Sequence, residues 1–210
     1  AKCMCAMGFR AILERGVVGR ESSWAGGGIL SPLCPWDYPD EVKRLALRGM
    51  DLFGELAEKL RRTTGIDPEY TRCGMLVLPP FDRPAALQWC AAHVMRVEDR
   101  GDGLFLPDVA QARNPRLLQA LRAQVEKLGG RIVEQCEVKQ IVSAASQVRH
   151  LATTQGDFSA DAYIVTAGAW SKVLLGEYAL KADIKPIRGQ MLLFKFDAPP
   201  LPHILLQGDI

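Results

Sequence analysis

Hydrophobic residues recur every three or four positions along residues 40–64, and this spacing predicts a long amphipathic helix. Its apolar stripe consists of Val42, Leu45, Met50, Phe53, Leu56 and Leu60. Charged residues such as Lys43 and Glu55 fall on the other face, so we expect the stripe to belong to the core. Asp40 is expected to cap the start of this helix and Gly65 its end.

The same kind of pattern predicts two further helices and several short strands. The helices are expected at 82–96 and 114–128, the second with Asn114 as N-cap and Pro115 at its first position. Short apolar or alternating runs predict strands at 9–13, 74–78, 104–106, 131–134, 138–142, 148–153, 162–165, 190–196 and 203–206. We expect the last two strands to lie in a separate, antiparallel sheet.

The stretch from residue 12 to residue 32 has the features of a dinucleotide site. Its strand ends at Glu14, and a carboxylate at a strand tip can accept hydrogen bonds from both ribose hydroxyls. Ser22 and Ser23 follow, and then the glycines of 26–28. Hydroxyls and bare backbone suit a phosphate or a flat ring, because glycine lets a ligand approach the main chain.

A structural interpretation of the same stretch stays open. Ser22 or Ser23 could simply cap a helix that begins there. Three glycines inside a helix cost about 1 kcal/mol each relative to alanine. Capping does not explain that cost, whereas close approach of a ligand does. A second turn of small residues, at 166–169, follows the strand predicted at 162–165 and permits another close backbone contact.

Composition narrows the class of protein. The chain has 210 residues, 24% of them charged, and a formal charge of +2, which suits one or two globular domains. No basic tract is present, so nucleic acid is not an expected partner. Without an apolar run of about 20 residues or a signal peptide, we expect no integral membrane segment and a cytoplasmic protein. The six cysteines lack a CxxC pair, which predicts free thiols and no metal site.

Both ends of the chain suggest a piece of a longer protein. It begins at Ala1 within what is predicted to be the last turns of a helix at 1–7, and it stops just after a strand. In a dinucleotide-binding unit, GxGxxG precedes the ribose acid by about 20 residues. That motif would therefore fall before Ala1.

Taken in order, the motifs resemble a known family. They are ERG (14–16), ESSWAGGGIL (21–30), TGID (64–67), GML (74–76), DVAQARNPRL (108–117), IVTAGAWS (164–171) and PIRGQ (186–190). Together they resemble the FAD-dependent amino acid oxidases of the glycine oxidase type, within the D-amino acid oxidase superfamily. The resemblance covers essentially the whole chain.

The resemblance implies an α/β protein. Its Rossmann-like FAD-binding domain is incomplete here and carries an inserted α+β substrate domain that contains an antiparallel sheet. The FAD-binding domain would comprise 1–75 and 107–180, and the substrate domain 76–106 and 181–210.

Five residues match the adenosine side of the family's cofactor site. Glu14 would bind the adenosine ribose, with Arg15 beside it near the adenine. Val138 matches a residue whose backbone holds the adenine. Ala167 and Gly168 match a second turn of small residues near the diphosphate.

Five others match the flavin side. Ser22 and Ser23 correspond to a hydroxyl pair that contacts the pyrophosphate and ribityl region. Gly27, Gly28 and Ile29 correspond to the backbone segment alongside the isoalloxazine, with Ile29 closest to the substrate.

The implied activity is oxidative deamination of glycine or another small (D-)amino acid. FAD takes a hydride from the α-carbon, the imine hydrolyses and oxygen accepts the electrons; in thiamine-pathway members the imine is used for thiazole assembly. No catalytic residue is assigned, because the substrate-binding arginine would follow Ile210. We therefore expect these 210 residues alone to be inactive. The partner is a small amino acid substrate, and homo-oligomerisation stays open.

Other functions remain as alternatives. A sarcosine oxidase-like enzyme or a D-amino acid dehydrogenase would share several of these motifs, and an inactive remnant would share all of them. A nicotinamide dehydrogenase would also use Glu14, but the stretch from Ser22 to Gly28 has no role in a plain NAD fold.

Overall fold

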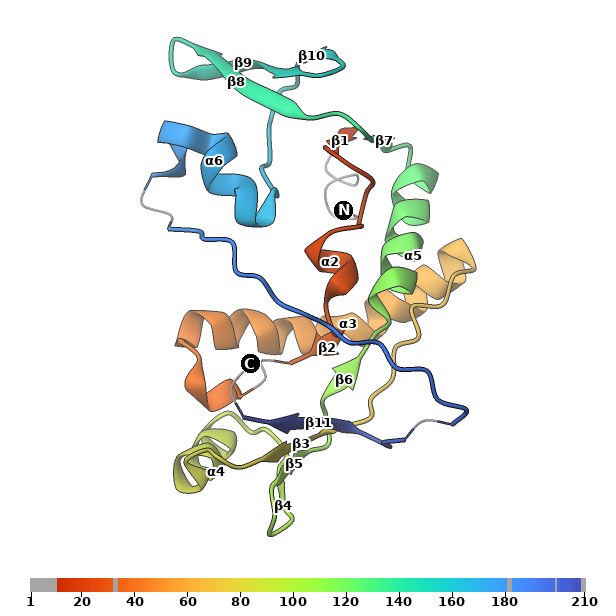
Figure 1. Ribbon diagram of the computed structural model, residues 1–210, viewed down its shortest axis with the longest axis vertical. Coiled ribbons are helices and arrows are strands. Elements are labelled where there is room, and N and C mark those ends of the chain that lie inside the picture. The colour runs from red at the N-terminus through yellow and green to blue at the C-terminus, as the bar shows by residue number, and fades with distance from the viewer. Residues whose placement is uncertain (1–10, 32–33, 181–182, 199, 209–210) are drawn as a thin grey trace. The chain divides into compact units, whose positions relative to one another are not determined.

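The computed structural model describes four stretches of the chain (Figure 1), namely 11–31, 34–180, 183–198 and 200–208. The helix expected at 1–7 and the start of the first strand lie outside them. The chain divides into two compact units, one formed by residues up to 20 together with 125–191, and the other by 21–124 together with residues from 192 onward. The domain boundaries expected from the sequence stay a prediction.

The first unit is built from short strands and single helical turns. Its elements are β1 (Ala11–Leu13), β7 (Arg131–Val133), β8 (Val138–Ala144), β9 (Gln147–Thr153), β10 (Gly156–Phe158), η2 (Gly168–Trp170), α6 (Ser171–Leu175) and η3 (Gly176–Ala179). β1 and β7 pair in parallel, with Ile12 opposite Ile132. β8, β9 and β10 form an antiparallel meander (Figure 1). Ala145 and Ser146 connect β8 to β9 with positive φ angles of 50° and 61°, which suit a tight hairpin turn.

The strand expected at 162–165 is not formed. These residues have no strand assignment, and Ile164 is 49% exposed, so the predicted strand is wrong. A strand needs a neighbouring strand to share its backbone hydrogen bonds. Within the described residues, β1 pairs only with β7, so it does not serve as a neighbour for residues 162–165. The short helix α6 begins at Ser171, directly after η2.

The second unit holds the long helix and a four-stranded sheet. Its elements are α2 (Ser22–Ala25), β2 (Ile29–Leu30), η1 (Pro35–Asp37), α3 (Asp40–Thr64), β3 (Met75–Leu78), α4 (Arg83–Ala92), β4 (Glu98–Asp99), β5 (Leu104–Leu106), β6 (Ala110–Gln111) and β11 (Ile204–Gln207). α5 (Asn114–Lys127) begins in this unit and starts at Asn114 itself, where the sequence had predicted an N-cap.

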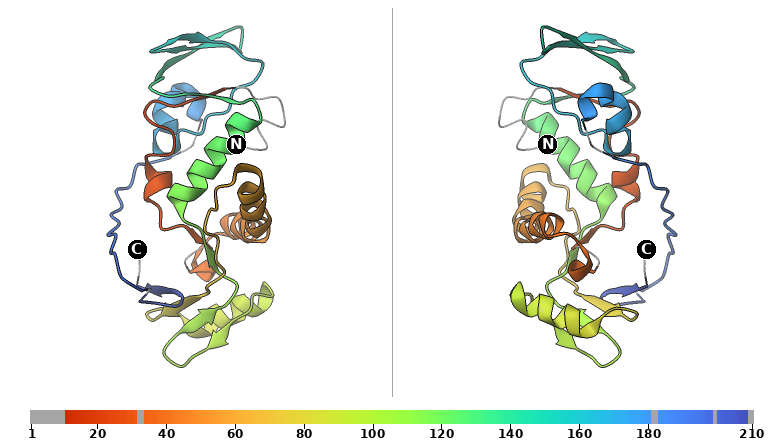
Figure 2. Two further views of the ribbon diagram at one scale, coloured as in Figure 1. Left: turned by 90° about the vertical axis from the view of Figure 1, so that its right-hand side faces the viewer. Right: turned by 90° about the vertical axis from the view of Figure 1, so that its left-hand side faces the viewer.

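The sheet has the strand order β11-β3-β5-β4, and α4 lies beside it (Figure 2). Trp89 and Cys90 of α4 pack with Met75, Val77 and Leu106 in the core of this unit. Burial raises the pKa of the Cys90 thiol. The three strands β3, β5 and β4 are antiparallel, but β11 pairs with β3 in parallel. The strand predicted at 203–206 is therefore present as β11, but its expected antiparallel pairing is wrong.

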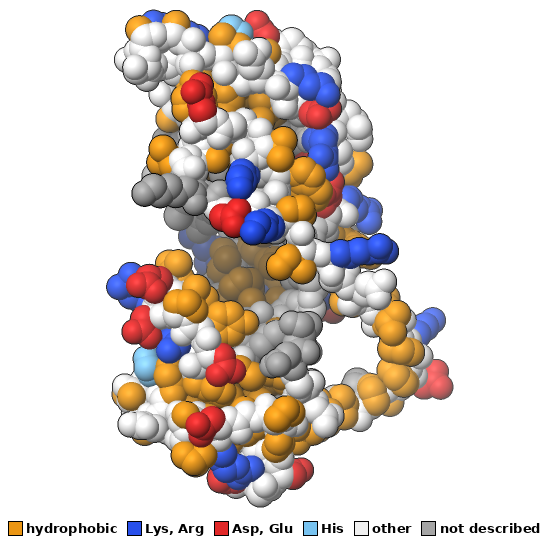
Figure 3. Space-filling view, turned by 60° about the vertical axis from the view of Figure 1, so that its left-hand side comes forward, with side chains coloured by type: hydrophobic (Ala, Val, Ile, Leu, Met, Phe, Trp, Pro, Cys, Tyr) orange, Lys and Arg blue, Asp and Glu red, His pale blue; other side chains and the backbone are white. Residues whose placement is uncertain are grey.

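The strand expected at 190–196 is also absent. These residues have no pairing partner among the described residues, and their side chains are exposed. Leu193, for example, is 92% exposed. Figure 3 shows a run of hydrophobic side chains along this extended segment. An apolar run forms a strand only where another strand can accept its hydrogen bonds.

The helix α3 spans 40–64 as predicted, and Gly65 ends it in the left-handed conformation at φ 74°. Pro39, not Asp40, is the N-cap residue, so Asp40 lies in the first turn, where its charge favours the helix dipole. Leu60 is buried, but Leu45 is 75% exposed. The predicted apolar stripe is therefore exposed at Leu45, whereas Met50 packs against the core and Leu60 is buried.

The helix α4 begins as expected but is shorter than predicted. The carboxylate of Asp82 accepts a hydrogen bond from the Ala85 N–H at 3.0 Å and caps the first turn. The helix ends at Ala92, and Val94 adopts a left-handed φ of 55°, which stops the helix before the expected end at 96.

Two further findings concern the described residues only. Among the described cysteines, Cys34, Cys73, Cys90 and Cys136 form no disulfide. None of the described helices combines the length and apolar character that crossing a membrane requires.

Candidate cofactor site

Glu14 is fixed at the end of β1. Its N–H donates to the Val133 carbonyl at 2.9 Å, and its carbonyl accepts from the Cys136 N–H at 2.8 Å. Its side-chain Oε1 accepts a hydrogen bond from the Gly16 N–H at 2.8 Å. The backbone thus orients this carboxylate, and within the described residues Oε2 accepts no hydrogen bond. A carboxylate held in this way suits a ligand that offers hydroxyl donors.

Val138 lies two residues beyond the segment that contacts Glu14. That segment is tied to the turn after β1, because the Gln135 N–H donates to the Gly16 carbonyl at 3.0 Å. A β-bulge falls between Val138 and Gln140 in the pairing of β8 with β9. A bulge takes backbone groups out of the regular ladder, which suits a residue expected to bind adenine through its main chain.

Arg15 lies beside the second turn of small residues. Its guanidinium carbon is 4.8 Å from the centroid of the Trp170 ring, a cation–π contact. Trp170 ends η2, and its N–H donates to the Ala167 carbonyl at 3.0 Å. Gly168 has a positive φ of 53°, and an added Cβ there would meet no atom within 4 Å. The first unit therefore brings Arg15 to the turn that contains Ala167 and Gly168.

Trp170 is the site neighbour that the sequence reasoning missed. The signal available was an aromatic residue directly after TAGA and an arginine directly after the strand-end acid. Arginine and tryptophan often form cation–π contacts. The sequence alone does not show that Arg15 and Trp170, 155 positions apart, are in contact.

In the second unit, the fold itself requires Gly28, and Gly26 lies against an asparagine side chain. Gly28 has a φ of 74°, and a Cβ there would lie 1.9 Å from the Ala112 carbonyl oxygen. A Cβ on Gly26 would lie 2.8 Å from Nδ2 of Asn114, which donates to the Gly26 carbonyl at 2.9 Å. The Ala112 N–H also donates to the Gly28 carbonyl at 2.9 Å. Contacts within the protein therefore explain Gly28 without a ligand, whereas the Asn114 side chain that a Cβ on Gly26 would meet can move aside.

Gly27 is different from both neighbours. Its φ is not positive, and the nearest atom to an added Cβ is Cγ1 of Ile29 at 4.0 Å. Within the described residues nothing else approaches that side of the glycine. A Cβ added to Gly27 would therefore meet only the Ile29 side chain, at ordinary contact distance.

Neither serine of the hydroxyl pair caps the short helix α2. Glu21 is the N-cap residue, and it makes no side-chain capping bond. Ser22 and Ser23 are helical residues with exposed side chains. The capping interpretation is therefore wrong, because each serine already has helical backbone and lies past the capping position. Their hydroxyls stand at the surface of the unit, where a ligand can reach them.

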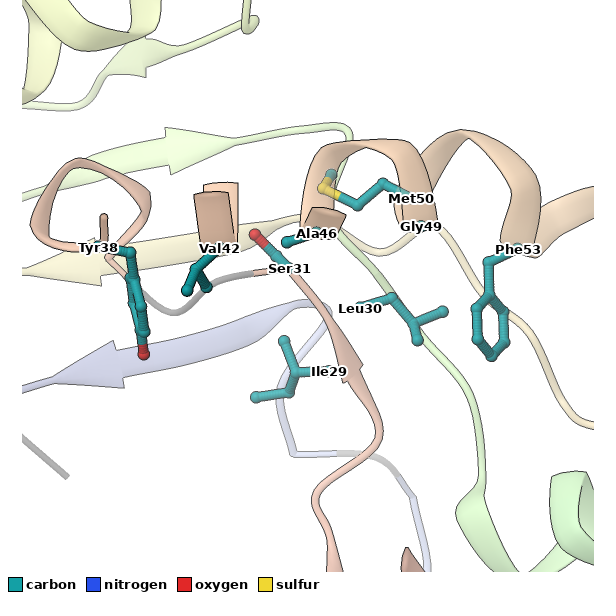
Figure 4. A pocket seen from close by; sticks show the side chains of 9 residues that line it. All are labelled: Ile29, Leu30, Ser31, Tyr38, Val42, Ala46, Gly49, Met50 and Phe53. Carbon is teal, nitrogen blue, oxygen red and sulfur yellow. The ribbon is translucent and has the colours of Figure 1, made fainter. Parts of the chain in front are cut away.

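A groove of about 300 Å³ opens between β2 and α3 (Figure 4). It is lined by Ile29, Leu30, Ser31, Tyr38, Val42, Ala46, Gly49, Met50 and Phe53. In Figure 4, Tyr38, Val42 and Phe53 extend toward the strand that carries Ile29 and Leu30. The groove has no charged lining residue, and its polar side chains are two hydroxyls.

The described residues fit a flavin dinucleotide better than a metal ion. They contain no group of three or more His, Cys, Asp or Glu side chains that could hold a metal. Within the first unit, the oriented strand-end carboxylate suits a ribose. Within the second unit, taken by itself, Gly27 offers bare backbone to a ligand.

Comparisons with known proteins agree on one family. The family model described as "FAD dependent oxidoreductase" matches residues 11–208. Glycine oxidase of Pseudomonas aeruginosa is 36% identical over 224 residues, covering 98% of this chain and 62% of the relative. Glycine oxidase of Pseudomonas putida is also 36% identical, covering 95% of this chain and 60% of the relative.

Solved structures agree. The crystal structure of glycine oxidase from Geobacillus kaustophilus matches with a TM-score of 0.71 and 27% identity, over 79% of this chain and 50% of that chain. The chain spans less than two thirds of the length of these relatives. The α/β fold and the family expected from the motifs are confirmed: the chain belongs to the family of FAD-dependent oxidoreductases.

Proposed function

We propose that the protein is a flavoenzyme that oxidatively deaminates glycine or another small amino acid, with oxygen as electron acceptor. The observation that carries this proposal is Gly27, whose missing side chain is not explained by packing among the described residues. A flat ring lying against the main chain would explain it. The similarity to glycine oxidases over nearly the whole chain supports the same reaction.

The first unit would hold the adenosine side of FAD. Glu14 would accept hydrogen bonds from ribose hydroxyls through Oε2, while the Gly16 N–H keeps Oε1 in place. Arg15, supported by the Trp170 ring, would face the adenine. Val138 would bind adenine through its backbone at the bulge, and the turn at Ala167 and Gly168 would admit a phosphate closely.

The second unit would hold the flavin side. FAD, when bound, supplies a ring that accepts a hydride from the α-carbon of the amino acid. Ser22 and Ser23 would donate hydrogen bonds to the phosphate and ribityl oxygens. Gly28 and Ile29 are held in place by β6, because Ile29 lies opposite Gln111 and the Gly28 carbonyl accepts from Ala112. This rigid backbone would fix the ring beside Gly27.

The test is spectroscopic and uses the purified full-length protein. It should carry flavin, and glycine added without oxygen should bleach the flavin absorbance. With oxygen present, ammonia and hydrogen peroxide should form in equal amounts. A protein that stays colourless after reconstitution with FAD would overturn the cofactor assignment. A flavin that no amino acid in a broad panel reduces would overturn the reaction.

A further inference from the structure

We propose that the outward face of α3 is a docking surface for a second copy of this chain, so that two copies pair their α3 helices antiparallel about a two-fold axis. Two exposed leucines, Leu45 and Leu52, and the charged residues beside them define this face. The face contains no residue of the proposed cofactor site, and it would serve self-assembly, a role separate from the proposed reaction.

The two leucines lie on the side of α3 that faces away from the core. Leu45 is 75% exposed and Leu52 is 46% exposed. They are seven residues apart, which is close to two full turns, so their side chains lie on one stripe of the helix. The core side of the same helix is formed by other residues, among them Met50 and Leu60. Aligned leucines of this kind are typical of a helix face that packs against another helix.

The charges on this face are arranged unfavourably for a helix without a partner. Arg44 and Arg48 are four residues apart and repel each other. Asp51 and Glu55 repeat the same spacing with negative charge. All four side chains are exposed, and none of them forms an ion pair within the part of the chain that the structure describes. Each charge is therefore available to a group on another molecule.

A two-fold axis through the middle of the face makes the face complementary to itself. Residues at equal distances from the axis lie opposite each other in two antiparallel helices. With the axis midway between Arg48 and Asp51, these residues of opposite charge face each other across the two copies. The same axis places Leu45 of one copy between Leu52 and Leu56 of the other, because its opposite position is residue 54.

Two further pairs follow the same symmetry. Arg44 of one copy comes beside Glu55 of the other, and Glu41 comes beside Lys59. Every one of these pairs joins opposite charges. Parallel helices would instead place each charge beside its own counterpart, so that Arg44 would face Arg44. The charge pattern therefore specifies both the antiparallel direction and a copy of this chain as the partner.

The experiment measures self-association of the purified full-length protein by sedimentation equilibrium. The unsubstituted protein should dimerise, and its dissociation constant should rise with salt because the ion pairs lie at the surface. Arg48→Glu brings two negative charges together at each end of this contact and should raise the dissociation constant about 10-fold or more. Arg149→Glu makes the same change of charge at an exposed residue of β9 and is the matched control, which should leave the dissociation constant unchanged.

An exchange of charges separates pairing from folding. Asp51→Arg alone should weaken the dimer as Arg48→Glu does, but an equimolar mixture of the two variants should form heterodimers, because each variant offers the charge that the other lacks. The double variant Arg48→Glu/Asp51→Arg should regain the dissociation constant of the unsubstituted protein. Failure of both the mixture and the double variant to regain pairing would overturn the proposal.

Two other results would also overturn it. One is an unsubstituted protein that stays monomeric over the measured concentrations, or whose association Arg48→Glu leaves unchanged. The other is a fall in the melting temperature of Arg48→Glu without any change in association, which would mean that another segment of a longer chain covers this face of α3.

Discussion

Neighbouring glycines of the 26–28 segment meet different physical demands. Gly28 needs its left-handed φ and the close approach of the Ala112 carbonyl, so the folded chain itself requires it. Gly27 has an ordinary φ and an open side, so the folded chain tolerates a side chain there. A substitution at Gly28 should therefore lower stability, whereas a substitution at Gly27 should impair cofactor binding.

A matched pair of substitutions tests that separation. Gly27→Leu in the full-length protein should abolish FAD retention, because the side chain occupies the ring position, while the melting temperature of the apoprotein stays nearly unchanged. Gly28→Ala should destabilise the protein by about 1–3 kcal/mol through backbone strain alone, before the clash with Ala112 is added. Flavin absorbance and urea denaturation measure the two effects. Normal FAD content in Gly27→Leu would contradict the ring placement.

Asn114 holds the glycine segment from the start of α5. Its Nδ2 donates to the Gly26 carbonyl at 2.9 Å. Asn114→Ala removes that bond and should cost about 0.5–1.5 kcal/mol of stability. Because the segment then moves more freely, FAD affinity should also fall, as measured by flavin fluorescence titration. Asn114→Asp, which keeps the size but loses the donor, should behave like the alanine variant.

At the scale of elements, an ion pair links the end of the α4 region to the segment between β5 and β6. The guanidinium of Arg96 donates to both carboxylate oxygens of Asp108, with Nε to Oδ2 at 2.8 Å. Arg72 lies near the same carboxylate, at 3.8 Å. The hydrogen bond from Arg96, aided by both positive charges, lowers the pKa of Asp108.

This lowered pKa gives a direction for pH dependence. The ionised carboxylate stabilises the fold above the unfolded pKa of about 3.9, and that contribution is lost as the pH falls through the lower folded value. Arg96→Gln should therefore reduce stability modestly at pH 7, because the pair is largely exposed. Urea denaturation should show the difference from the unsubstituted protein shrinking below the folded pKa of Asp108. A difference that grew in acid would contradict this assignment.

The elements that could be predicted from sequence are those with local causes. The helix α3 follows from its own spacing and from Gly65, and β5 follows from three consecutive apolar residues. The segments at 162–165 and 190–196 have the same local character, but a strand also requires a neighbour. Local pattern contains no information about that neighbour, nor about the parallel direction of β11.

The same limit applies to the site. The position of Glu14 at the end of a strand could be predicted because a strand-end acid is a local signal. The hydrogen bond to the Gly26 carbonyl could not be predicted, because its donor is Asn114, 88 positions away in the chain. Packing within the protein requires glycine at position 28. The cofactor contacts expected for Gly27 and Gly28 stay predictions.

For the whole molecule, the exposed segment at 190–196 has a practical consequence, namely self-association. An extended apolar chain with unpaired backbone groups is a template on which a second molecule can add a strand. Its exposed large residues are Met191, Leu192, Leu193, Phe194 and Phe196. Concentrated solutions of these 210 residues should therefore aggregate with a β-rich signature.

One charge in this segment should suppress that aggregation. Leu193→Lys should leave the melting temperature nearly unchanged, because the side chain is 92% exposed, and should slow the growth of light scattering and thioflavin fluorescence. Leu45→Lys, also on an exposed leucine but within α3, is the control and should aggregate like the unsubstituted protein. If both variants slowed aggregation equally, net charge and not the extended segment would govern how long the protein stays dissolved.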